Sequence, residues 1–517
     1  MSAPEIDADA PDRSWFAAYL FCAVVTALPL LSTYRLPSAD LPQHAAQMAL
    51  WRSFHEPCYA FSSIYEINWF TPYLVGYCIT RVFAFFLTVN AALKWTIYFA
   101  ALALPLAALL ATRRSRIDPW LALLMFPLAY GFSFYWGFVN FLVAVPIGIA
   151  FVILQLRQSD SPEFARALLL AGCGFILAAS HALALAVFVG TAGVVHLARS
   201  RSVRDFIVGA IPLIIPIPPF LWWMISMRST EARANAPLQL GIGPHRILEF
   251  FQDLLGAAAD PEALATAMLI IVVIALSGVR PSRDWRRYVP ASCVLAAFLF
   301  LPASFFGQIF LHQRFAIAVI PAAFLALDPS TPFLRRRMIR ALIVIVVCTW
   351  MAVLAARFHR FHRDAEGFDR LVDVMPSNET IALLNLNFGS EAVPGSPFLH
   401  FASDYQERKG GINAWSFSNN FPTFIRYKRD ARVARIPPIA SHHPEFFRWE
   451  RDATGLDEII VRAPLDLSSF VFAGHTNEIR LRARAGMWWL YTRRVRSNEC
   501  APLERSDASS RRPILDW

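Results

Sequence analysis

The chain has 517 residues, of which 56% are hydrophobic, and its mean hydropathy is +0.43. Several charge-free runs are near the roughly 20 residues that cross a bilayer, which excludes a purely soluble protein and predicts a polytopic α-helical membrane protein. The formal net charge of +10 would suit nucleic acid, but Lys and Arg form short clusters between apolar runs. Such clusters are typical of cytoplasmic loops, so we expect membrane lipids and no nucleic acid as partners.

The first apolar run, 15–33, lacks a preceding basic segment and a small-residue cleavage site, which predicts a retained transmembrane helix. A polar outer loop, 34–69, follows it. The next run, 71–88, is interrupted by Arg81, and we predict a re-entrant or interfacial segment. Single crossings are predicted at 95–112, 206–227, 263–279, 288–304, 313–327 and 341–356, and about two crossings each in 118–157 and 166–199.

Four basic clusters, at 113–116, 199–204, 280–287 and 335–340, are separated by even numbers of predicted crossings. All four can therefore be cytoplasmic together. This predicts eleven crossings with the N-terminus inside, the C-terminus outside and an outer loop at 228–262. A twelve-helix alternative, in which 71–88 also crosses and the N-terminus is outside, stays open.

Charged and polar residues increase after about residue 357, and no further span appears. Alternating stretches at 379–386 and 457–462 are typical of strands. We therefore predict two parts: a membrane module, 1–356, and a soluble α/β domain, 357–517, on the outer, periplasmic side.

The outer side would gather several polar residues. Directly after the first helix comes Asp40, followed by Gln43 and His44 at the start of a short predicted helix. A carboxylate there could act as a general base, or hold a divalent cation such as Mg²⁺ or Mn²⁺ together with His44. The alternative is that Asp40 only caps the helix. Gln43 would line a substrate groove.

The next outer turn, 130–140, is aromatic and ends at Asn140; Trp136 and Asn140 would form one wall of a lipid or sugar groove, or belong to an aromatic membrane belt. His181 lies at the turn between two spans, where it would help to bind a phosphate or would simply be a packed or capping residue.

His312 and Arg314 stand at the outer end of a helix, where Arg314 could hold a lipid phosphate through its planar fork of donors or could be an interfacial anchor. His245, in the 228–262 loop, is a further groove candidate. His359, His362, His442 and His443 give only a weak metal pattern.

The outline of a first helix, an outer loop with an acidic residue, further spans and a C-terminal outer domain resembles the GT-C fold of polyprenyl-phosphate-dependent glycosyltransferases. Protein O-mannosyltransferases and aminoarabinose transferases have an Asp-Glu pair just past the first helix, soon followed by His or Tyr. The matching stretch here is Asp40-Leu-Pro-Gln-His44. Leu41 departs from the pattern by replacing the second acid, and the 130–140 turn carries no Asp-x-Asp.

The resemblance implies an inverting glycosyltransferase of a bacterial inner membrane, which takes sugar from a polyprenyl-phosphate donor and passes it to a glycan, lipid or protein acceptor of the cell envelope. Asp40 would be the base, and Arg314, His312 and His181 would hold the donor phosphate. The rival interpretations are a transporter or flippase for a lipid or glycan, and a non-catalytic envelope assembly protein.

Overall fold

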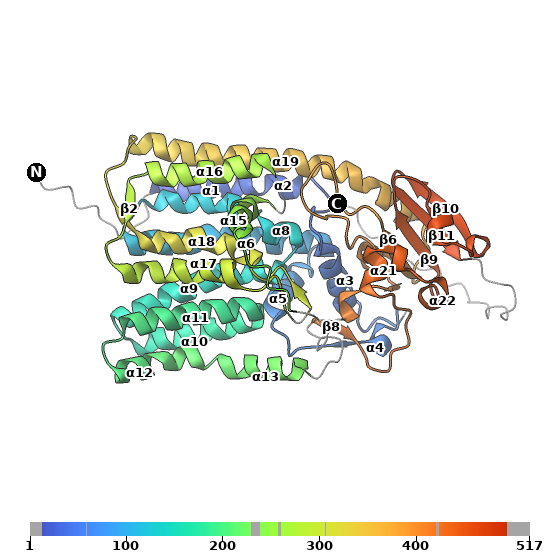
Figure 1. Cartoon of the computed structure of the whole chain (residues 1–517), viewed down its shortest axis with the longest axis horizontal. Coiled ribbons are helices and arrows are strands. Elements are labelled where there is room, and N and C mark those ends of the chain that lie inside the picture. Colours follow the sequence, from blue (N-terminus) through green and yellow to red (C-terminus); the bar gives the residue numbers. More distant parts are fainter. Residues whose placement is uncertain are drawn as a thin grey trace, which may run out of the picture.

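The computed structural model describes residues 13–57, 59–228, 238–256, 260–305, 307–419 and 423–493. Most of them form a bundle of helices that run side by side along the long axis of the molecule, with a smaller mixed α/β part at one end (Figure 1). The bundle contains α1 (Arg13–Thr26), α2 (Leu28–Leu31), α6 (Val89–Ser115), η1 (Pro119–Leu124), α7 (Met125–Leu128), α8 (Phe132–Trp136), α9 (Val139–Asp160), α10 (Phe164–Ser180), α11 (Ala182–Arg199), α12 (Val203–Ile214), α13 (Ile217–Arg228), α16 (Pro261–Leu276), α17 (Val289–Phe300), η3 (Gln313–Phe315), α18 (Ala316–Ala323), η4 (Phe324–Ala326) and α19 (Arg336–Val374).

Apolar helices occupy every predicted crossing. Within the described residues, five helices are long and apolar enough to span a bilayer alone: Arg13–Leu31, Val89–Ser115, Val139–Asp160, Ala182–Arg199 and Arg336–Val374. A sixth span, Val203–Ile214 with Ile217–Ser226, is bent by 54°. Pro216, between its two halves, explains the bend, because proline removes a backbone hydrogen bond. The chain is a multi-pass membrane protein, and the total of eleven crossings stays a prediction.

The segment 71–88 contains only the ten-residue α5 (Leu74–Phe83). Ten residues rise about 15 Å, half of the hydrocarbon thickness. Arg81 on this helix lies over the rings of Trp51 and Phe85. A short helix of this kind suits the predicted re-entrant or interfacial segment better than a twelfth crossing.

The basic clusters meet at the end of the bundle opposite the α/β part. Arg114, Arg199 and Arg280, from three of the four clusters, line one cavity there. Arg340, from the fourth, pairs with Asp118 in the loop between α6 and η1. The four basic clusters, which the sequence predicts to share one side of the membrane, therefore lie at the same end of the bundle.

The C-terminal part is built on a five-stranded sheet in the order β10-β11-β9-β6-β7, in which β6 is parallel to both of its neighbours and the remaining pairs are antiparallel. Its strands are β6 (Thr380–Asn385), β7 (Ile412–Asn413), β9 (Glu458–Arg462), β10 (Ile479–Ala485) and β11 (Trp488–Arg493), and its helices are α20 (Ser403–Lys409), η5 (Phe417–Asn419), α21 (Pro438–His442), η6 (Pro444–Phe446), α22 (Trp449–Asp452), α23 (Ser468–Val471) and η7 (Thr476–Glu478). The strands predicted at 379–386 and 457–462 are present as β6 and β9. The boundary predicted at 357 falls inside the single helix α19, which continues from the bundle to Val374 and packs Phe368 on Trp488 of the sheet.

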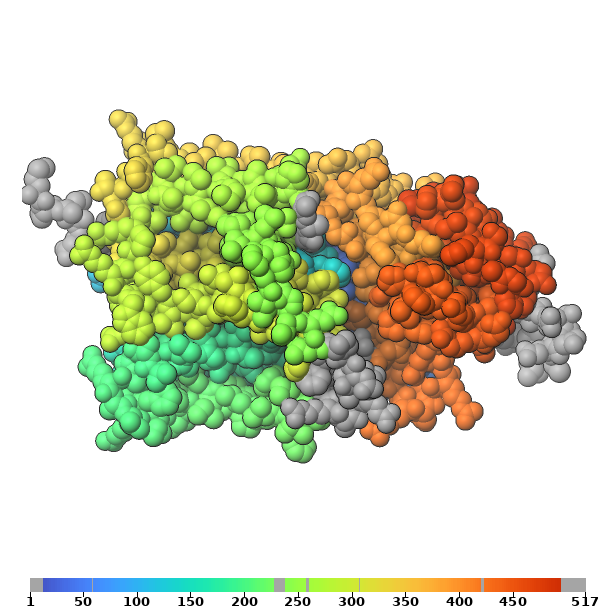
Figure 2. Space-filling view, in the orientation of Figure 1, coloured from blue at the N-terminus to red at the C-terminus, as the bar shows by residue number. Residues whose placement is uncertain are grey.

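The predicted outer loop, 34–69, joins this C-terminal part to the bundle. The loop contains α3 (Leu41–Arg52), α4 (Phe61–Ile64) and β1 (Tyr65–Ile67), and β1 pairs with β8 (Ile425–Tyr427). The buried Arg35 forms ion pairs with the buried Asp404 of α20 and with the partly exposed Asp369 of α19. Figure 2 shows the resulting seam, where the orange C-terminal part meets the green and yellow bundle and cyan and blue atoms of the N-terminal third are visible.

The remaining elements are short connections. They are α15 (His245–Leu255), η2 (Trp285–Tyr288) and the ribbon pairs β2 (Val279–Pro281) with β5 (Leu327–Pro329) and β3 (Ser304–Phe305) with β4 (Gln308–Ile309). The predicted outer loop 228–262 is described only in part, at 238–256 and from 260 onward.

Candidate active site

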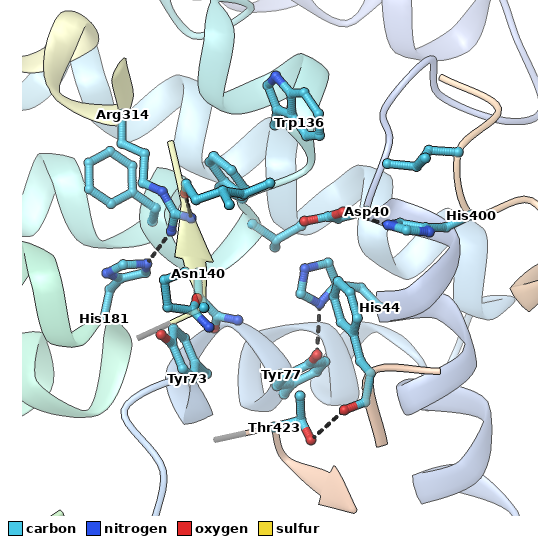
Figure 3. A pocket seen from close by; sticks show the side chains of 18 of the residues that line it. Asp40, His44, Tyr73, Tyr77, Trp136, Asn140, His181, Arg314, His400 and Thr423 are labelled. Atoms are coloured by element: carbon cyan, nitrogen blue, oxygen red, sulfur yellow. Dashed lines mark hydrogen bonds and ion pairs between the residues drawn. The ribbon is translucent and has the colours of Figure 1, made fainter. Parts of the chain in front are cut away.

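A cavity of about 250 Å³ lies between the bundle and the C-terminal part. One side, which we call the bundle wall, is formed by residues of α8 to α11 and η3: Trp136, Phe138, Asn140, His181 and Arg314. The other side, which we call the domain wall, is formed by His400, Trp415, Phe417 and His442. Asp40, His44, Tyr73 and Tyr77 lie between the two walls (Figure 3).

Asp40 stands at the N-cap position of α3, but its side chain makes no capping hydrogen bond. Its carboxylate lies instead beside His400, with 3.3 Å between Oδ1 and Nε2. The alternative in which Asp40 only caps the helix is therefore wrong as far as the side chain is concerned. A carboxylate at the start of a helix that leaves the backbone N–H groups unused is available for another task.

The backbone around Asp40 is fixed by the aromatic turn. The N–H groups of Ala39 and Asp40 donate to the carbonyls of Tyr135 and Trp136, at 2.9 and 3.1 Å. Gly137 has a φ of +79°, and a Cβ there would lie 2.7 Å from Ser38 Oγ and 3.1 Å from the Asp40 nitrogen. Only glycine allows this close approach, which explains the glycine-punctuated sequence of the turn.

Arg314 is the cation of the bundle wall and is buried. Its guanidinium donates to the carbonyls of Phe310 and Ile309, at 3.1 and 3.0 Å, and lies 3.7 Å from the ring centroid of Phe138. Among the described residues, no carboxylate forms an ion pair with Arg314. A buried charge without a counter-ion is costly, so an anion entering the cavity would be attracted to it.

His181 supports this guanidinium. Its Nε2 lies 3.1 Å from Arg314 Nη1, and because arginine can only donate, the imidazole accepts and is neutral. The ring is packed edge-on against Phe141 and Tyr73. His181 therefore helps to hold the Arg314 guanidinium in its orientation.

His44 and Asn140 complete the predicted set that lines the cavity. His44 Nδ1 lies 2.7 Å from the Tyr77 hydroxyl, and burial lowers the pKa of His44 to about 4. Asn140 Oδ1 accepts from the backbone N–H of Gly76, at 3.1 Å, and so ties α9 to α5. Within the described residues, no group of three or more His, Cys, Asp and Glu is arranged to hold a metal ion.

Three predicted residues lie outside the cavity lining. Gln43 instead holds the domain wall from behind, because its Oε1 accepts from the Phe417 N–H at 2.9 Å. His312 contacts Glu249 of α15, at 3.3 Å, and packs on Phe298. His245 begins α15 and is likewise absent from the lining.

The domain wall was missed by the sequence analysis, apart from His442, which was considered only as a weak metal ligand. His400 is buried and stacks on Trp415, with 4.4 Å between ring centroids and 14° between planes. His442 lies next to both rings, and burial lowers its pKa to about 4. The spacing of Gln43 and Gln47 on one face of α3 could have indicated that this face meets another part of the chain, since both amides bond to residues 415–425.

No sequence family matches the chain, and no curated protein matches it in sequence. Among solved structures, the chain is similar to ArnT from Cupriavidus metallidurans, crystallised with undecaprenyl phosphate. The TM-score is 0.53 at 11% identity, over 94% of this chain and 99% of that one. The chain has the GT-C fold. The arabinofuranosyltransferase AftD from Mycobacteria aligns with a TM-score of 0.49 and 12% identity, over 96% of this chain and 41% of that one.

This likeness agrees with the GT-C fold expected from the sequence and covers the bundle and the C-terminal part together. At 11% identity it concerns the fold alone. The chemistry of the cavity has to be argued from this chain's own residues.

Proposed function

We propose that the chain is an inverting membrane glycosyltransferase, which moves a sugar from a polyprenyl-phosphate donor to an envelope acceptor on the side of the C-terminal part. That side would be the periplasmic face of a bacterial inner membrane. The observation that carries the proposal is that two side chains line one cavity: the Asp40 carboxylate, which makes no capping hydrogen bond, and the buried Arg314 guanidinium, which forms no ion pair with any carboxylate among the described residues. Figure 3 shows both side chains at the cavity, with the Asp40 carboxylate turned toward His400 and Arg314 next to His181.

The donor would bind with its phosphate at Arg314 and its sugar between the two walls. In the GT-C neighbour from Cupriavidus metallidurans, the bound lipid is undecaprenyl phosphate, which supports a polyprenyl phosphate as carrier. The bundle wall adds Trp136 and Phe138 to the cavity. Aromatic faces of this kind suit the apolar C–H groups of a sugar or the first units of a polyprenyl chain.

In the reaction, Asp40 would accept the proton of the acceptor hydroxyl while that oxygen forms a bond to the anomeric carbon. The bond between this carbon and the phosphate oxygen breaks, and its electron pair leaves with the polyprenyl phosphate. A single displacement of this kind inverts the anomeric configuration. Arg314 would stabilise the charge that grows on the departing phosphate, and such preorganised charge stabilisation is often the largest catalytic contribution.

His400 would be a positioning residue. Its Nε2–H can donate to Asp40 Oδ1, which leaves Oδ2 to face the acceptor. His400 Nδ1 is buried and has no hydrogen-bond partner among the described residues, so the contact of Nε2 with Asp40 is the polar contact that this ring makes there.

The proposal is tested by lipid extracts from a deletion strain that carries the wild-type gene, the Asp40→Asn variant, or no gene. The donor lipid should accumulate without the gene and return to normal with the wild type. Asp40→Asn keeps the size of the side chain and removes the base, so transfer should fall at least about 100-fold. Asp118→Asn is the matched control, because Asp118 caps η1 at the other end of the bundle. Equal complementation by both variants, at equal expression, would contradict the role of Asp40.

A further inference from the structure

A second cavity, of about 540 Å³, lies at the far end of the bundle from Asp40. It is surrounded by the ends of α6, α9 and α11, by η2, and by the β2–β5 ribbon, and Figure 1 shows β2 at the end opposite the C-terminal part. Its charged lining residues are Arg114, Arg116, Arg199, Arg280, Arg287, Asp284 and Asp328. The lining therefore carries a net charge of +3.

Three of these arginines have structural partners. Arg114 and Arg199 lie in the last turns of α6 and α11, where a cation favours the helix dipole, and both pair with Asp160. Arg287 pairs with Asp328. The ion pairs of these residues are sufficient to explain their presence at this end of the bundle.

Arg116 and Arg280 are not explained in this way. Neither forms an ion pair within the part of the chain that the structure describes. Asp328 lies opposite Arg280 in the ribbon but is already bonded by Arg287, and Asp284 Oδ1 accepts from the Arg286 N–H. In addition, Arg199 also lines this cavity, and its buried Nε has no hydrogen-bond partner among the described residues. The cavity thus holds donors and positive charge that its own carboxylates do not satisfy.

The position of the cavity relative to the lipid headgroups indicates which ligands could reach it. Trp285 and Phe333, in the loops that surround it, are 64% and 82% exposed. Exposed aromatic side chains beside arginines are typical of the boundary between lipid tails and headgroups. Basic pockets between helices at this depth are a general means of binding phosphorylated headgroups.

We propose that this cavity is a phosphate-binding site on the basic side of the membrane, separate from the cavity at Asp40. The shared chemistry is a phosphate group that accepts hydrogen bonds from Arg116, Arg280 and Arg199. The phosphate is carried by an anionic lipid headgroup or by a soluble phosphate compound. A bound headgroup would join the ends of α6 and α11 to the β2–β5 ribbon and would fix these segments relative to one another.

The test uses the full-length protein, purified in detergent and depleted of lipid. Its melting temperature is measured with phosphatidylglycerol, with phosphatidylcholine, and with inorganic phosphate. Two double variants are compared: Arg116→Gln with Arg280→Gln in the cavity, and Arg201→Gln with Arg283→Gln as matched control. Arg201 and Arg283 are exposed and come from the same basic end, but they do not line the cavity.

Phosphatidylglycerol should raise the melting temperature of the wild type and of the control pair. It should bind the cavity pair about tenfold more weakly or worse, since two of the charged donors are gone. Stabilisation of the wild type by inorganic phosphate, lost in the cavity pair, would assign the site to soluble phosphate compounds. Equal weakening in both pairs would overturn the proposal in favour of a diffuse basic surface, as would no weakening in either.

Discussion

The two walls of the cavity at Asp40 differ in charge and in origin. The bundle wall carries a permanent cation, Arg314, whose neighbouring His181 is a neutral acceptor. The domain wall carries no Arg or Lys among its described lining residues and presents two histidines, the buried His400 and the half-buried His442. In the proposed reaction, the bundle wall with Arg314 suits the departing phosphate, and the domain wall suits a hydroxyl acceptor. The difference in charge between the walls would therefore place the donor phosphate and the acceptor on opposite sides of the cavity.

Replacement of Arg314 should have the largest effect, on the bundle wall. Arg314→Met should reduce transfer about 100- to 1,000-fold, the usual range for losing one preorganised charge-stabilising donor. Its melting temperature should stay close to that of the wild type, because removal of a buried charge without a counter-ion offsets the lost hydrogen bonds. Arg314→Lys keeps the charge but loses the fork, so it should retain more activity than Arg314→Met.

Rates of transfer and melting curves are measured together on the purified variants. Full activity of Arg314→Met would remove the charged wall from the account and leave Arg314 as an interfacial anchor.

Replacement of His400 should have a smaller effect, on the domain wall. His400→Ala should lower transfer by about tenfold, which corresponds to one hydrogen bond to a charged group. His400→Gln, which can still donate, should restore part of the rate.

His443→Ala is the control for His400, since His443 is exposed and contacts Glu445 and Phe446 away from Asp40. An unchanged rate of transfer in His400→Ala, at normal expression and melting temperature, would show that His400 only packs against Trp415.

Gly137 tests whether the aromatic turn fixes the backbone that carries Asp40. Gly137→Ala places a Cβ against Ser38 and the backbone of Leu41 and Asp40 at a φ of +79°. We expect a loss of about 1–3 kcal/mol in stability, together with a loss of transfer, because the backbone that carries Asp40 must move. Gly190→Ala is the matched control, because its Cβ would have open space within a helix, and it should be neutral or slightly stabilising. Thermal unfolding and transfer rates separate the two variants.

His44 gives the smallest expected effect, on the dependence of stability on pH. Its pKa of about 4 lies below the value of about 6.5 for an unfolded histidine, so the unfolded state binds more protons between these values. Stability should therefore be complete above about pH 6.5 and should fall as the pH decreases toward 4. His44→Gln should flatten the slope of melting temperature against pH in this window. An unchanged slope would assign the acid sensitivity to other groups, such as His442.

The bundle wall could be predicted from sequence because its signals are local. Charge-free runs locate the helices, and a histidine or arginine at the end of such a run, like His181 or Arg314, must lie near the membrane surface. The domain wall could not be predicted, because His400 reaches Asp40 only through a fold that joins residues 360 positions apart. Gln43 was misplaced for a geometric reason. On a helix, Asp40 and His44 share one face, while Gln43 and Gln47 share the adjacent face, which here meets the C-terminal part.

The most direct test of the account follows a radiolabelled sugar on its polyprenyl phosphate. Purified protein in detergent is mixed with this donor and with membranes from the deletion strain as the source of acceptor. The account predicts that the wild type moves the label from the polyprenyl lipid to another molecule, with inversion at the anomeric carbon, and that Asp40→Asn does not. If the label stays on the polyprenyl lipid with well-folded wild-type protein, the chain is not a transferase for that donor, and a lipid carrier or an assembly protein becomes the better interpretation.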